Sequence, residues 1–234
     1  KWLVRLKELY AAAVQYFQGM VQVDMTDLGG NLDVLSSFRP GEELLMDLLM
    51  DPEAVKEKTW EAHEHWWRCF EDLQEVLHPG DLNPGYSAWL TLFSEIPYYV
   101  LQCDFSYMIS PEQFDTFVKP ELTASAQRLG NAFYHLDGPG ELNHLDSLLE
   151  IQAIKGIQWV PGDGNAPLDQ WPEIMKKITD AGKLTWIWGN FEQIERIFEQ
   201  TGGAKNHCVT MSVNKKNENE ALKFLDRWGV PREG

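Results

Sequence analysis

The spacing of apolar residues changes along the chain from a helical period to short alternating or continuous runs. In the first third, apolar side chains recur three and four residues apart, which predicts amphipathic helices. Gly19 ends the first of these helices, and the pair Asp51-Pro52 begins the longest one with a capping residue followed by proline. The helices expected here cover residues 2–18, 42–50 and 52–77, and the alternating stretch MVQVD, residues 20–24, is expected to be a strand.

Short apolar runs alternate with amphipathic helices over the rest of the chain. Ser110, Pro111 and Gln113 form a capping-box start for the helix that follows the first of these runs. The expected strands are residues 97–104, 131–137, 156–160, 183–190 and 206–213, and the later helices are residues 142–149, 170–181, 191–200 and 218–228. Strand–helix units of roughly 25 to 35 residues indicate repeated right-handed βαβ crossovers and a buried parallel sheet.

Two architectures satisfy this alternation, an open doubly wound sheet and a closed (β/α)8 barrel. A nucleotide-binding open sheet normally carries a GxGxxG turn or a P-loop after an early strand, and the sequence has neither. Six strands are expected, whereas a barrel has eight, and the chain opens at Lys1 inside a helical pattern. We therefore expect an α/β fold of the (β/α)8 TIM-barrel type, one domain over residues 1–234, without its N-terminal strands.

Charge and cysteine content disfavour several classes of partner and of structural framework. With 36 acidic and 20 basic residues, the formal net charge is −16, which disfavours nucleic acid and anionic membrane surfaces as partners. Cys69, Cys103 and Cys208 lie far apart and form no CxxC pair, so a disulfide framework is not expected. No apolar run reaches the roughly 18 residues of a membrane span. We expect a cytoplasmic protein.

The functional residues of a (β/α)8 barrel gather at the C-terminal ends of its strands, whatever the reaction. Here those ends combine one histidine, several carboxylates, thiols and tryptophans, which suits a flat or apolar small molecule held near an acid, a base or a metal. The candidate catalytic groups are Asp24, Asp104, His135 and Asp137, and the candidate substrate contacts are Tyr107, Trp159, Trp186, Trp188 and Asn190. Cys103, Met211, Ser212 and Asn214 also lie at these ends.

Each candidate also has a purely structural interpretation. Asp104 and Asp137 can cap the helices that follow them. An isolated histidine at a strand end, such as His135, is often a hydrogen-bonded structural group. Trp186 and Trp188 share one strand face and are as well suited to a core as to a ligand-binding wall. His63 and His65 lie two residues apart on a predicted helix, which is the wrong spacing for a shared metal, and both are expected to face solvent.

The stretch NAFYHLDGPG, residues 131–140, is the most informative of the strand ends. His135 and Asp137 alternate, so both side chains face the same side of the strand end. Gly138 and Gly140 let the chain turn sharply beyond them.

Three stretches together resemble the uroporphyrinogen decarboxylase superfamily. They are ISPEQFDTFVKPEL, the strand NAFYHLDG and LLEIQAIKGIQWVPGDG, and the earlier LLMDLLMDPEAVKE is similar to a helix of that family ahead of the central strands. The resemblance covers roughly residues 40–228. It implies a (β/α)8 barrel of the kind found in uroporphyrinogen decarboxylase and in zinc-dependent methyltransferases that serve corrinoid proteins and coenzyme M.

The methyltransferase branch of that family carries His-x-Cys at this strand end and a second cysteine near the end of the barrel, which bind a zinc that holds a substrate thiolate. The resemblance therefore implies His135 as a ligand, Asp137 in the place of the first thiolate, and Cys208 as the distant cysteine. Carboxylate oxygen is an accepted zinc ligand. A corrinoid protein as partner and pairing into a homodimer, with Trp60, Trp66 and Trp67 as a contact face, are further expectations.

The function expected from the resemblance is methyl transfer to or from a small substrate. Decarboxylation of uroporphyrinogen is disfavoured, because an acidic mouth repels a substrate with many carboxylates. Two alternatives stay open: a glycosidase-like barrel with two carboxylates flanking a sugar stacked on tryptophan, and a barrel that binds a small ligand without turnover.

Overall fold

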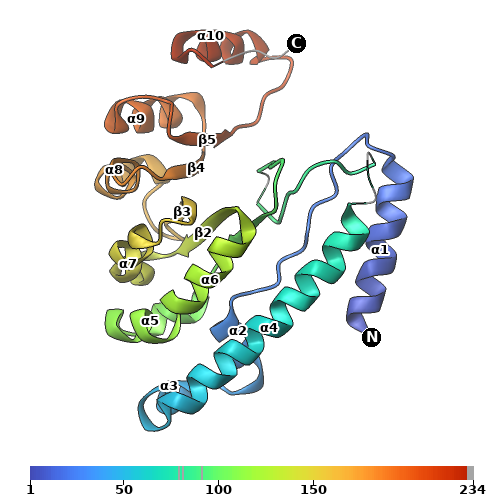
Figure 1. Ribbon diagram of the computed structural model, residues 1–234. Coiled ribbons are helices and arrows are strands. Elements are labelled where there is room, and N and C mark those ends of the chain that lie inside the picture. The colour runs from blue at the N-terminus through green and yellow to red at the C-terminus, as the bar shows by residue number, and fades with distance from the viewer. Residues whose placement is uncertain (79, 81, 91, 231–234) are drawn as a thin grey trace. The chain divides into compact units, whose positions relative to one another are not determined.

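The computed structural model describes residues 1–78, 80, 82–90 and 92–230. Its internal contacts divide the chain into two compact units. The first unit contains Lys1–His135 and Gly140–Ile154, and the second contains Leu136–Pro139 and Lys155–Gly234. Figure 1 shows the elements of both units in chain order by colour.

Five strands form one parallel sheet in the order β1-β2-β3-β4-β5, which is also their order along the chain. Sequential parallel order is typical of part of a (β/α) barrel, although a closed barrel has eight strands. The strands are β1 (Tyr98–Leu101), β2 (Asn131–Asp137), β3 (Ile154–Val160), β4 (Leu184–Trp188) and β5 (His207–Thr210). All five lie within the strands expected from the sequence or overlap them, so the parallel α/β prediction is confirmed.

Most helices of the first unit also match the sequence pattern, and α4 shows why. Asp51 caps it by accepting a hydrogen bond from Ala54 N (3.3 Å), and proline occupies its first position. The apolar stripe expected from the spacing, from Val55 to Leu77, is buried. The helices are α1 (Trp2–Phe17), α2 (Asn31–Phe38), α3 (Gly41–Met50), α4 (Pro52–Leu77), α5 (Pro111–Phe117), α6 (Lys119–Leu129) and α7 (Leu145–Glu150), with 3-10 turns η1 (Asp104–Met108) and η2 (Pro139–His144).

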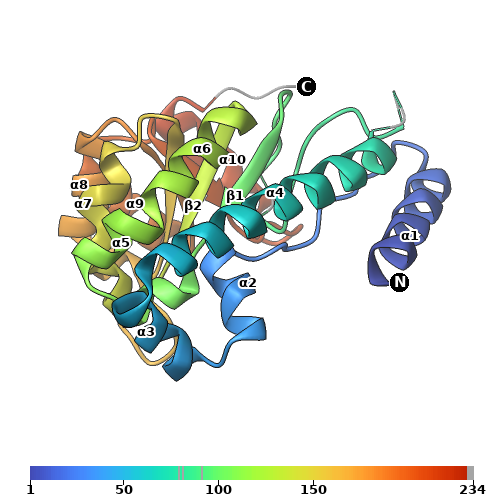
Figure 2. The same cartoon turned by 60° about the horizontal axis from the view of Figure 1, so that its bottom comes forward.

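The long helix α4 organises the core of the first unit. Helices α1, α2 and α3 all pack against it, with α1 beside one end and α3 at the other (Figure 2). The Trp66 ring stacks on Phe70 at 5.4 Å and meets Tyr99 of β1 edge-on at 4.9 Å. Aromatic pairs in these geometries add to the free energy gained from burying their area.

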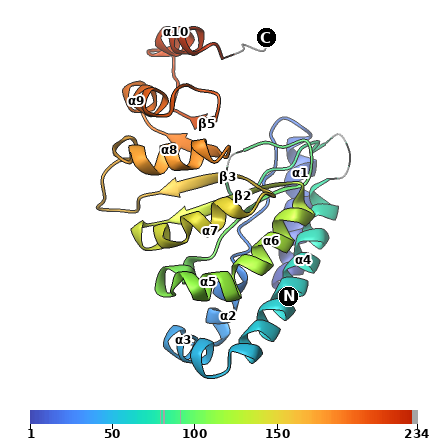
Figure 3. The same ribbon diagram turned by 60° about the vertical axis from the view of Figure 1, so that its left-hand side comes forward.

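In the second unit the strands β3 to β5 alternate with helices. The helices are α8 (Pro172–Asp180), α9 (Phe191–Thr201) and α10 (Glu218–Trp228), preceded by the 3-10 turn η3 (Leu168–Gln170). Helix α8 packs against both α9 and β4 (Figure 3). In the β4–β5 pairing Trp186 lies opposite Cys208, and Trp188 lies opposite Thr210.

The strand expected at residues 20–24 is wrong. Residues 20 and 21 form a bend and residues 22–24 join no sheet, and a side chain supplies the partner that a neighbouring strand would supply. Asn83 Oδ1 accepts from Val23 N (2.8 Å), and Asn83 Nδ2 donates to Val23 O (3.1 Å). Alternation over only five residues could not distinguish these two arrangements.

Two helical segments also differ from the sequence-based expectation. Helix α2 lies where a polar loop was expected, since its buried side chains are Asn31 and Leu32 and give no long apolar stripe. The single helix expected at residues 142–149 is divided into η2 and α7. Both errors arise in short segments, where few apolar positions define the period.

Candidate functional site

His135 and Asp137 lie at the C-terminal end of β2, as the sequence predicts, and both are half-buried. The His135 ring meets the Trp89 ring edge-on, with centroids 5.0 Å apart at 83°. Farther down the same face of β2, Phe133 contacts Tyr98 at 6.3 Å. The imidazole of His135 is therefore held against an aromatic surface of the first unit, while its partial exposure leaves it open to a ligand.

The opposite face of β2 carries a buried polar cluster that sequence reasoning missed. Burial raises the pKa of the Cys103 thiol and the Tyr134 hydroxyl well above their ordinary values. His144 donates from Nε2 to Ser106 O (2.8 Å) and stacks on Phe114, and burial lowers its pKa. At neutral pH these side chains are uncharged, which suits a structural core more than nucleophilic chemistry.

Asp33, rather than Asp104, is the half-buried carboxylate beside the end of β1. Its two oxygens accept from Phe105 N (2.7 Å), Asp104 N (3.1 Å) and Gly30 N (3.1 Å). Burial raises the pKa of Asp33 against the opposing effect of these three donors. The side chain of Asp104 is exposed. Asp33 could not be singled out from the sequence, since it lies in a segment where a polar loop was expected.

Gly30 allows this close arrangement. A Cβ atom at Gly30 would lie 2.2 Å from the backbone oxygen of Gln102 and 2.5 Å from Asp33 Oδ2. Any side chain there would push the start of α2 away from the end of β1. The backbone at residue 30 therefore helps to fix Asp33 in place.

Asp24 and Tyr107 lie on segments other than β2, and each has contacts of its own. Asp24 follows the extended stretch and its carboxylate accepts a hydrogen bond from Ser87 Oγ. Tyr107 is 59% exposed on η1, and its ring lies so close to Gly140 that a Cβ there would collide with it.

The tryptophans of the second unit divide into core and surface groups. Trp159 is fully buried and packs edge-on against Trp171 at 5.3 Å, so its ring belongs to the core. Trp186 and Trp188 share a half-exposed face, with centroids 5.0 Å apart, and Trp186 Nε1 donates to Thr210 Oγ1 (3.0 Å). These two rings remain the aromatic surface that the sequence predicts.

Asn190 has a structural role at the start of α9. Its Oδ1 accepts from Gln193 N (2.9 Å), and Gln193 Oε1 accepts from Asn190 N (3.0 Å), which is a complete capping box. This reciprocal pair uses the Oδ1 and backbone N of Asn190, so both atoms serve the start of the helix.

The proposed metal ligands do not assemble a three-ligand group. Among the described residues, no cluster of three or more His, Cys, Asp or Glu side chains has a geometry that could hold a metal ion. Cys208 is the second residue of β5 rather than the last, and burial raises the pKa of its thiol. A thiol of raised pKa is a poorer metal ligand, because the thiolate is the form that binds.

His63 is not exposed, contrary to the expectation from its spacing. It is buried on α4, where its Nδ1 lies 2.9 Å from Glu121 Oε1, and Ser125 Oγ donates to the same oxygen (2.7 Å). His65 on the same helix is exposed, as expected. The helix turns about 100° per residue, so two histidines two positions apart face opposite environments.

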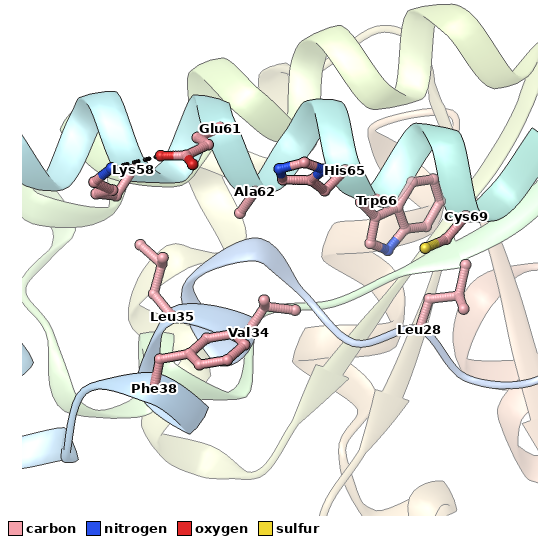
Figure 4. A pocket seen from close by; sticks show the side chains of 10 residues that line it. All are labelled: Leu28, Val34, Leu35, Phe38, Lys58, Glu61, Ala62, His65, Trp66 and Cys69. Carbon is pink, nitrogen blue, oxygen red and sulfur yellow. Dashed lines mark hydrogen bonds and ion pairs between the residues drawn. The ribbon is translucent and has the colours of Figure 1, made fainter. Parts of the chain in front are cut away.

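A second feature that sequence reasoning missed is an apolar pocket of about 550 Å³ between α2 and α4 (Figure 4). Its walls are mainly aliphatic and aromatic, and the ion pair Lys58–Glu61 lies at its rim (2.6 Å). His65 and Cys69 project from successive turns of α4 along it. The only sequence signal was the few apolar residues of α2, among them Val34, Leu35 and Phe38, which were too few to predict a helix.

Comparison with known proteins supports the fold assignment. The structure is similar to a methyltransferase from Methanosarcina mazei with a TM-score of 0.58 and 12% sequence identity. The match covers 94% of this chain and 63% of that protein, so the chain spans less than two thirds of its length. No model of a known protein family matches the sequence, and no curated protein matches it either. In the described part of the chain, no helix is long and apolar enough to cross a membrane.

Proposed function

We propose that the protein takes part in methyl transfer to or from a small substrate, with the end of β2 as its reactive site. The observation that carries this proposal is the fold similarity to a methyltransferase over 94% of the chain, together with the His-x-Asp strand end at His135 and Asp137. The family resemblance supplies a corrinoid protein as the methyl carrier in this proposal. A parallel sheet with its functional groups after the strands supports the placement of the site.

The chemistry assigned to this site is removal of a proton from a substrate thiol. The His135 imidazole is half-exposed beside Trp89, and its ring nitrogen is suited to accept that proton. Asp137, two residues on, provides a carboxylate that can orient the imidazole or the substrate. When bound, a methylcorrinoid supplies the methyl group and retains the electron pair of its cobalt–carbon bond. The substrate sulfur contributes the pair for the new bond.

The zinc expected from the family resemblance fits this donor set poorly. His135 and Asp137 would supply two ligands, and among the described residues no third His, Cys, Asp or Glu side chain completes a metal-binding group with them. Catalytic zinc sites usually have three protein ligands. No step above is therefore assigned to a metal, and metal content remains a direct test of the resemblance.

The test is anaerobic methyl transfer from methylcobalamin to 2-mercaptoethanol, followed by the absorbance change of the corrinoid and by detection of the methyl thioether. We expect turnover by the wild type and a loss of about 10²- to 10⁴-fold in His135→Ala, which is the usual contribution of a general base. Asp137→Asn should also lose activity. The matched control Asp146→Asn changes an exposed carboxylate of α7 and should retain it.

Two results would contradict the proposal. One is folded wild-type protein that forms no methyl thioether, and the other is turnover that survives in both His135→Ala and Asp137→Asn. Elemental analysis of the wild type and His135→Ala, purified without chelator, gives an independent result. Stoichiometric zinc that disappears in the variant would restore the metal-assisted form of the reaction.

A further inference from the structure

The loops after β3 and β4 line an open cavity of about 310 Å³ that lies entirely within the second unit. Trp188 forms one wall, and the turn that contains Asp163 forms another. We propose that this cavity binds a small molecule with a quaternary or tertiary ammonium group, held between the Trp188 ring and the Asp163 carboxylate. This goes beyond the proposed methyl transfer and does not depend on it.

The aromatic wall is the first argument. The Trp188 ring is half-exposed and lies 5.0 Å from the Trp186 ring at an angle of 39°, so the two indoles form one continuous surface. The hydrogen bond from Trp186 Nε1 to Thr210 Oγ1 (3.0 Å) fixes this surface. Tryptophan is the side chain that attracts cations most strongly through its ring face, and quaternary ammonium ligands are the usual guests of such sites.

The charge of the lining is the second argument. Among the described residues that line the cavity, Asp163 alone has an ionisable side chain, and that side chain is acidic. Its Oδ1 accepts from Gly164 N (3.0 Å), and Asn165 Nδ2 donates to Pro161 O (2.8 Å), which holds the turn in shape. No lysine or arginine in this lining could pair with an anionic ligand. The net charge of −16 adds a general attraction for cations.

The size of the cavity is the third argument, because it limits which ligands can fit. A volume of about 310 Å³ is at the lower end of the range of roughly 300–1,000 Å³ for small-molecule sites. It suits a compact head group rather than a long chain. Gly162 and Gly164 have φ values of +82° and +80°, so the turn takes a conformation that most other residues would strain.

The test compares choline with 3,3-dimethylbutan-1-ol, in which a carbon atom replaces the charged nitrogen while the shape is kept. Isothermal titration calorimetry on the full chain measures both. We expect choline to bind about tenfold more tightly, because only the cation gains from the ring and the carboxylate. Equal affinity for the two compounds, or binding of neither, would overturn the proposal. Since binding is measured without turnover, this result is independent of the methyl-transfer assay.

Variants of the lining residues test whether choline binds in this cavity. Trp188→Leu should remove the preference for choline, and Trp188→Phe should reduce it. Asp163→Asn should also weaken the preference, and added salt should weaken it in the wild type because salt screens the attraction between the carboxylate and the cation. The matched control is Trp2→Leu, which changes an exposed tryptophan of α1 in the first unit. If folded Trp188→Leu keeps the full preference for choline over 3,3-dimethylbutan-1-ol, the binding site lies elsewhere. If that variant does not fold, an unchanged preference in Asp163→Asn, whose side chain is exposed, has the same meaning.

Discussion

His207 shows how a single side chain can depend on its surroundings for its charge state. It lies at the start of β5 with Nδ1 2.6 Å from Thr185 Oγ1 and Nε2 2.7 Å from Thr201 Oγ1, and Phe198 packs beside its ring. Burial lowers its pKa from an ordinary value near 6.5 to about 4. The imidazole is therefore neutral in the folded protein throughout the physiological range.

This lowered pKa predicts a loss of stability in acid. Below pH 6.5 the unfolded chain protonates His207 before the folded protein does, so the free energy of unfolding falls as pH decreases from about 6.5 to about 4. A single group contributes at most about 1.4 kcal/mol per pH unit, and partial exposure reduces that figure. Urea denaturation of the wild type and His207→Gln at several pH values measures the effect. A difference between the two that stays constant with pH would contradict it.

At the scale of elements, the start of α9 is fixed by a cap rather than by a ligand. Asn190→Ala removes the acceptor for Gln193 N and should lower the free energy of unfolding by about 1 kcal/mol. Asn190→Asp and Asn190→Ser keep an acceptor oxygen and should retain most of the stability. Chemical denaturation of the three variants distinguishes them. If the alanine variant is as stable as the wild type, the capping role is wrong and a substrate contact becomes the better interpretation.

Other helices and strands show which parts of the fold the sequence could predict and which it could not. Long periodic segments such as α4, and strands such as β2 whose bounds match residues 131–137, were predicted because many positions repeat the period. Short segments failed where one tertiary contact decided the outcome, as with Asn83 beside Val23. The position of His135 near the end of β2 was predicted together with that strand. Asp33 was missed because its role comes from backbone donors on distant residues.

At the scale of the whole molecule, the net charge of −16 dominates the electrostatics. Most ion pairs, such as Arg39–Asp47 and Lys176–Asp180, are exposed and contribute little. Self-repulsion among excess carboxylates is then the larger effect, and salt should screen it. We expect the thermal unfolding midpoint to rise as sodium chloride increases from low concentration to about 0.15 M. Scanning calorimetry measures this, and a midpoint that falls with salt would mean that the ion pairs outweigh the repulsion.

The tryptophan clusters give each unit its own optical signal. In the first unit Trp66 lies 5.2 Å from Trp67 and 4.9 Å from Tyr99, whereas in the second unit Trp186 lies 5.0 Å from Trp188. Rings this close couple their electronic transitions and produce strong near-ultraviolet circular dichroism only while the packing persists. Trp188→Leu removes the contribution of the Trp186–Trp188 pair and leaves that of Trp66 and Trp67 in the first unit, while the Trp159–Trp171 pair of the second unit, 5.3 Å apart, is also retained. Near-ultraviolet circular dichroism can therefore report the order in which the two units unfold.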